Sequence, residues 1–132
     1  MTSKASFAWL TLLCGAIFAQ SWRPERIVGL EYPKTALAQG VEGAVHVECY
    51  IADDGSVIRA EVVSGKAELA SAAARNAMHW RFVRTSSDEE KYSLTYHFEI
   101  QQVTKPSYPP KFRFVMPGNI FVTAEKIATK GE

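Results

Sequence analysis

The sequence predicts an α+β fold in which two helices cover one face of a three-stranded antiparallel sheet, with a C-terminal β-hairpin added. Apolar and polar residues alternate over residues 45–51, 58–62 and 92–100, a pattern typical of strands with one buried and one solvated face. Helical segments before the first and third of these strands complete the order α-β-β-α-β. Two further alternating segments, at residues 111–116 and 120–124, predict the hairpin.

An apolar run near the N-terminus is typical of a secretory signal peptide. Lys4 precedes this run, which covers residues 5–19. A membrane span needs about 20 apolar residues, so the shorter run fits a signal that is cleaved near Ala19. We therefore expect an exported protein whose signal peptide is residues 1–19. An uncleaved membrane anchor is the alternative.

Composition argues against some classes of function. The 132 residues include 15 Lys and Arg against 14 Asp and Glu, and removal of Lys4 would leave 14 of each sign. A neutral chain without a basic run gives no electrostatic reason to bind nucleic acid. Cleavage also removes Cys14, which leaves Cys49 without a partner for an intramolecular disulfide. The fold must then depend on its core.

The first helix and a hairpin follow a connector at residues 20–31. Pro33 and Gly40 bracket a two-turn helix at residues 32–40, because Pro fits a first helical turn and Gly fits a C-terminal exit. The sequence DDGS at residues 53–56 then separates the first two strands. A calcium loop would need further acidic residues at alternate positions. We interpret the two aspartates as the bend of a hairpin.

The second helix and the third strand complete the predicted domain. The alanine-rich residues 67–79 have high helix propensity, and their narrow apolar stripe ends at Trp80, which we expect in the core. A polar loop at residues 84–91 leads to the third strand at residues 92–100. A right-handed crossover would place this strand beside the first one, at an edge of the sheet.

The solvated faces of the first and third strands carry two imidazoles and two carboxylates, from His46, Glu48, His97 and Glu99. Zinc accepts such ligands, but no tight ligand motif is present, so we interpret them as a solvated polar face. The chain also contains no nucleophile elbow, phosphate loop or Cys-His pair in a catalytic motif. The sequence therefore predicts no enzyme, no metal site and no cofactor.

Several short motifs follow one another along residues 32–100. They are Tyr32-Pro33 with Ala36, Glu42-Gly43 with Val45 and Val47, Asp54-Gly55 with Val57, Val63-Ser64-Gly65, Leu69 with Ala73, and Asn76-Ala77-Met78 before Trp80-Arg81-Phe82. Together they resemble the C-terminal domain of TonB, the energy transducer of Gram-negative envelopes. Ala70 departs from the pattern, since many relatives carry Asp there. We therefore expect a TonB-like domain at residues 32–102 and a tail at residues 103–132, with its hairpin at residues 111–124.

The resemblance implies a protein-binding domain without a catalytic site. In that family, a short extended segment of an outer-membrane receptor adds as a strand to the sheet edge near the last strand. Carried over to this chain, the partner-binding residues are Tyr92, Ser93, Leu94, Thr95, Tyr96, His97 and Phe98. The resemblance thus implies a periplasmic module linked to TonB-dependent transport across the outer membrane. Its partner would be a segment of an outer-membrane receptor or of another envelope protein.

The tail leaves a second function open. In this alternative, the chain is a structural or self-associating envelope module, in which the tail hairpin closes the edge or a second copy pairs with it as a homodimer. Transmission of force across the envelope by this chain alone is disfavoured, because the connector lacks a Pro-rich spacer and spans roughly 40 Å even when extended. Two prolines stiffen residues 107–110, and we expect the hairpin to dock elsewhere and leave the third strand available.

We predict export and cleavage. The mature protein isolated from the cell envelope should begin near Gln20, because the apolar run is shorter than the roughly 20 residues that a membrane span needs. N-terminal sequencing checks this prediction. A chain that still begins at Met1 and sediments with membranes would identify the segment as an anchor instead.

Overall fold

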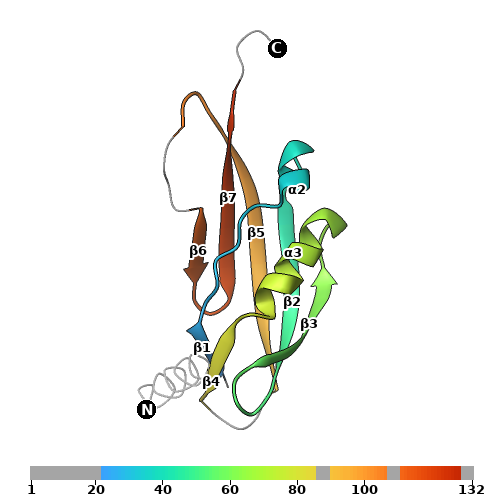
Figure 1. The fold of residues 1–132 in the computed structure, drawn as a ribbon, viewed down its shortest axis with the longest axis vertical. Helices are drawn as coiled ribbons and strands as arrows, with labels where there is room; N and C mark the ends of the chain where they lie inside the picture. Colours follow the sequence, from blue (N-terminus) through green and yellow to red (C-terminus); the bar gives the residue numbers. More distant parts are fainter. Residues whose placement is uncertain (1–21, 86–89, 107–110, 129–132) are drawn as a thin grey trace, which may run out of the picture.

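The computed structural model describes residues 22–85, 90–106 and 111–128 (Figure 1). In chain order the elements are β1 (Trp22–Arg26), α2 (Lys34–Ala38), β2 (Gly43–Ile51), β3 (Val57–Ser64), α3 (Ala67–Ala77), β4 (Arg81–Arg84), β5 (Lys91–Val103), β6 (Phe112–Val115) and β7 (Asn119–Ile127). The signal peptide and the proline linker predicted from the sequence lie outside the described residues. Within those residues, no helix has both the length and the apolar character to cross a membrane.

The three predicted strands are present and are neighbours in one sheet, as predicted. β2 lies between β3 and β5 and pairs with both in antiparallel orientation, so the third predicted strand does lie beside the first. The bend between β2 and β3 is the predicted turn. The Asp54 carboxylate accepts hydrogen bonds from the backbone N–H and the hydroxyl of Ser56, which lowers the pKa of Asp54. Gly55 has a positive φ of 90°, and a Cβ there would lie 2.0 Å from the Phe82 carbonyl oxygen.

The sheet has five strands rather than the three predicted, and it is mixed rather than antiparallel. Its order is β3-β2-β5-β7-β6, with β7 parallel to β5 and β6 antiparallel to β7. After β5 the chain reaches the outer position first, runs back as β6, and returns as β7 between β6 and β5 (Figure 1). The predicted hairpin is therefore present. The expectation that it docks away from the third strand is wrong.

A physical reason for this insertion lies in the apolar face of β7. Ile120, Val122 and Ala124 alternate along the strand and are all buried in the same core as the helices. Burying a side chain such as Ile or Val contributes about 1.5–3 kcal/mol relative to leaving it exposed. A two-stranded hairpin alone is marginal. The hairpin formed by β6 and β7, which we call the tail hairpin, gains this energy only by extending the sheet.

The predicted connector at residues 20–31 contains a strand. β1 pairs antiparallel with β4 to form a separate two-stranded sheet. Trp22 is buried, and the Arg84 guanidinium lies 4.5 Å from the centre of its ring. The sequence WRPER is too short for a clear period and contains Pro24, which argues against a strand, so sequence patterning did not reveal it. The helices are also shorter than predicted, since α2 begins at Lys34 and ends at Ala38 and α3 ends at Ala77.

The predicted stripe of α3 packs on the sheet. Leu69, Ala73 and Ala77 are fully buried in the core, and the small alanines allow the helix to lie close to the strands. Trp80 follows the helix and is 1% exposed. Its ring is stacked with that of Phe82 and meets that of Phe114 in β6 edge-on, at centroid distances of 6.1 and 5.4 Å. Trp80 thus joins the helix layer to the tail hairpin.

Asn76 is the one buried polar side chain among the described residues, and it uses its whole hydrogen-bonding capacity. Its amide nitrogen donates to the carbonyl oxygens of Val28 and Gly29, at 2.9 and 3.1 Å. Its amide oxygen accepts from Trp80 Nε1 and from the Tyr96 hydroxyl, at 2.9 and 2.7 Å. Burial raises the pKa of Tyr96, so this hydroxyl stays protonated and donates. The amide therefore ties α3 to β5 and to the segment after β1.

We predict that Trp80→Ala lowers the free energy of unfolding by about 3–5 kcal/mol, because it leaves a large cavity and removes one of the two hydrogen bonds that the Asn76 oxygen accepts. Chemical denaturation followed by circular dichroism measures the loss. Trp80→Phe is the matched control, since it keeps an aromatic ring and should cost less than the alanine variant. Wild-type stability in the alanine variant would contradict the core role.

Candidate strand-binding site

The predicted partner-binding residues occupy the first half of β5. Tyr92, Leu94, Tyr96 and Phe98 point their side chains into the core beneath the helices. Ser93, Thr95 and His97 point to the opposite face of the sheet, which we call the open face. Burial raises the pKa of Tyr92 to about 12. The side chains therefore alternate as predicted. Four of the seven are buried in the core, where a partner cannot contact them.

β5 is not an edge strand, which corrects the sequence-based prediction. One side of β5 pairs with β2 from Phe98 to Lys91, and the other pairs with β7 from Thr95 to Val103. The Thr95 N–H donates to the Gly118 carbonyl oxygen at 2.7 Å. From Thr95 onward, the backbone groups on this side of β5 are thus paired with the tail of the same chain. The ladder with β7 does not include Tyr92, Ser93 and Leu94. No comparison or contact tests binding at these residues, so such binding stays a prediction.

The junction before β7 is packed tightly against β5. A Cβ added to Gly118 would lie 2.3 Å from the Ser93 carbonyl oxygen and 3.4 Å from the Tyr92 ring. Such a contact is impossible without a shift of the backbone. Glycine at this position therefore allows the tail hairpin to approach β5 at the very place where the partner was expected.

The polar side chains of the open face take partners within the sheet. His46 Nδ1 lies 3.0 Å from Thr95 Oγ1, and His97 Nε2 lies 3.2 Å from Asn119 Oδ1. The His97 ring also stacks on Phe121 at 4.7 Å. Over residues 22–85, 90–106 and 111–128, no group of three or more His, Cys, Asp or Glu side chains is placed to hold a metal.

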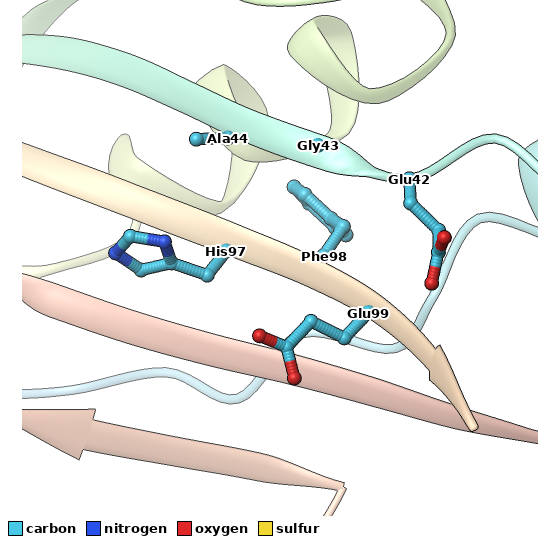
Figure 2. A pocket seen from close by; sticks show the side chains of 6 residues that line it. All are labelled: Glu42, Gly43, Ala44, His97, Phe98 and Glu99. Atoms are coloured by element: carbon cyan, nitrogen blue, oxygen red, sulfur yellow. The ribbon is translucent and has the colours of Figure 1, made fainter.

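A shallow pocket lies where β2 begins beside β5 (Figure 2). Glu42, Gly43, Ala44, His97, Phe98 and Glu99 line it. One carboxylate oxygen of Glu42 accepts the Ile100 N–H at 2.6 Å, just beyond the last residue pair between β2 and β5. Glu42 thus caps a backbone group of β5 that has no strand partner. The arrangement of these residues supports a structural role and offers little to a ligand.

Two strands end the five-stranded sheet in the described part of the chain, and β3 is the first. Its register against β2 moves by two residues between Ser64 and Val62, and again between Arg59 and Val57. Val63 and Ile58 are therefore the extra residues of two β-bulges, and they are 60% and 65% exposed. Bulges are a common protection of sheet edges against further pairing. β3 is long but poorly suited to receive a strand.

β6 is the other terminal strand, and it pairs with β7 without a register shift. Thr123 donates its N–H to the Lys111 carbonyl oxygen at 3.0 Å. Because paired residues in an antiparallel ladder alternate between bonded and non-bonded, Phe112 and Phe114 direct their backbone groups away from β7. These groups form the outer edge of the sheet. The sequence showed the alternation of this strand, but its place at the edge depends on the insertion of β7.

Comparison with known proteins gives one family match. The family model described as Gram-negative bacterial TonB protein C-terminal matches residues 28–101. Searches of the curated proteins and of the solved structures gave no match. The matched residues run from the segment just after β1 into β5, so the tail hairpin lies beyond the family match.

We predict that Gly118→Ala loosens the tail hairpin, because the added methyl group collides with the Ser93 carbonyl oxygen. Amide hydrogen exchange should accelerate at Thr95, whose N–H is bonded to residue 118. Gly29→Ala is the control, since a Cβ there has no neighbour within 4 Å. Unchanged protection of the Thr95 amide in Gly118→Ala would contradict the tight packing at this junction.

Proposed function

Because the chain belongs to the family of Gram-negative TonB C-terminal domains, we propose that it is a periplasmic module that binds an extended segment of an envelope protein by strand addition. The family consists of envelope-associated protein-interaction domains that contact outer-membrane receptors and other envelope proteins. Under this proposal the module serves TonB-dependent transport across the outer membrane. It has no catalytic role.

The outer edge of β6 is the observation that carries this proposal. The backbone groups of Phe112 and Phe114 point away from β7, and an extended segment adds to such an edge through main-chain hydrogen bonds. The rings of both residues pack against the core, which holds the strand in place. An antiparallel partner would place every second N–H of its own backbone against this edge.

Binding at Tyr92 to Phe98, as predicted from the sequence, requires a different state of the chain. β7 would have to leave β5, which exposes the buried Ile120 and Val122. Each of these side chains contributes about 1.5–3 kcal/mol by its burial, before any hydrogen bond of the nine paired residues of β7 is counted. We therefore propose that the intact chain uses β6, and that β5 receives a partner only where the tail hairpin has left.

The second candidate is a structural envelope module. The pairing of β7 along β5 favours it, because the tail closes the edge that the family uses for its partners. Charge disfavours two of the registers in which a homodimer could form through β6. A twofold axis through Arg113 would set two guanidinium groups opposite each other, and one through Phe112 would set Arg113 opposite Lys111. Like charges directly opposite in a sheet are destabilising.

We predict that the neutral peptide acetyl-TTVTVTT-amide adds to β6 as an antiparallel strand with its valines opposite Phe112 and Phe114. Its addition should shift the NMR signals of these two amides and leave those of β3 unchanged. N-methylation of both valines should abolish binding, because their N–H groups face β6 in this register. N-methylation of the central threonine, which faces away, is the control.

Binding that survives methylation of the valines would contradict strand addition at β6. An absence of peptide binding at millimolar concentration, with the fold intact, would favour the structural candidate.

A further inference from the structure

We propose that the β6 edge selects an extended segment that carries an acidic side chain opposite Arg113. This inference rests on the proposed function and adds the chemistry of the partner to it. Arg113 lies in the middle of β6, is exposed, and stands on the open face. Its guanidinium lies 4.5 Å from the centre of the Phe121 ring in β7.

Stacking holds this guanidinium in a defined place. Phe121 is itself stacked on His97, so the three side chains form a row across β6, β7 and β5. A long side chain that is already ordered loses less conformational entropy when it binds a carboxylate. Because Arg113 is exposed, the N–H groups of its guanidinium remain accessible to an anion.

No carboxylate of the described residues lies within ion-pair distance of Arg113. Arg59 in β3 is the instructive contrast. Its guanidinium also lies over an aromatic ring, that of Tyr50 at 4.0 Å, but it pairs with Glu61 at 3.7 Å. The arginine on the bulged edge therefore has a carboxylate partner within its own strand. Arg113, on the edge proposed to bind a partner, has no carboxylate partner among the described residues.

The register of β6 brings an incoming side chain close to Arg113. Arg113 lies opposite Phe121. Its backbone N–H and C=O groups point toward β7, because bonded pairs alternate along the ladder and Lys111 with Thr123 is a bonded pair. Arg113 is therefore a non-hydrogen-bonded position toward an added strand, where opposed Cα atoms are about 4.5 Å apart and side chains are closest. A Glu at that place meets the guanidinium, and its two neighbours lie beside Phe112 and Phe114.

The test uses two synthetic peptides, acetyl-TTVEVTT-amide and acetyl-TTVKVTT-amide. Both sequences read the same in either direction, so the result does not depend on the orientation of the added strand. The full-length chain should bind the glutamate peptide about 3- to 10-fold more tightly than the lysine peptide at low salt, because Arg113 attracts the glutamate and repels the lysine, and these two weak effects act in the same direction. The preference should fall as salt screens the charges.

Variants assign the preference to one residue. Arg113→Gln should bind the two peptides equally, and Arg113→Glu should prefer the lysine peptide. Arg59→Glu is the matched control, since it changes another stacked arginine on the other edge, and it should keep the wild-type preference. Circular dichroism and thermal melting confirm that each variant is folded.

The outcomes separate this inference from the proposed function. Equal binding of both peptides by the wild-type chain, with shifts at the Phe112 and Phe114 amides, overturns the role of Arg113 and leaves strand addition standing. A glutamate preference that persists in Arg113→Glu also overturns it. Failure of these peptides and of the neutral peptide to bind overturns strand addition at β6, and the inference falls with it.

Discussion

The side-chain amide of Asn76 is the interaction on which the rest of the structure depends. It donates twice to the segment after β1 and accepts once from Trp80 and once from Tyr96. A buried amide group left without a partner costs about 1–3 kcal/mol, so all four bonds must form together. They fix the rotation of α3 on the sheet, the position of β5 beneath it and the path of the N-terminal segment. Apolar packing alone is non-directional and would allow other alignments.

The tail hairpin completes the core that this network organises. Trp80 is bonded to Asn76 on one side and meets the Phe114 ring of β6 on the other. β7 fills the space beside β5 with Ile120 and Val122, both fully buried. The tail of the chain thus supplies the strand beside β5. This placement moves the edge of the sheet outward by two strands and leaves β5 as an interior strand.

The two edges of the sheet are built differently. β3 carries two bulges and an internal ion pair between Arg59 and Glu61, features that discourage a further strand. β6 is regular, short and marked by a stacked arginine without a carboxylate partner in the described residues. An edge that is neither bulged nor neutralised is open to pairing, and under our proposal Arg113 selects the segment that pairs. The contrast between the two edges supports a binding role for β6 and a protective design for β3.

The sequence by itself determined the pieces of this protein. The alternation of residues 45–51 and 92–100, the turn around Gly55 and the helical stripe that ends at Trp80 all predicted local structure and the face of each element that is buried. Tertiary structure decided which strands are neighbours. Alternation identifies a buried face, but the hydrogen bonds that pair β7 with β5 use backbone groups that every strand has. For this reason the sequence could identify the tail hairpin and not its insertion. It predicted β5 at the edge of the sheet, whereas the burial of β7 against the core makes β6 the terminal strand.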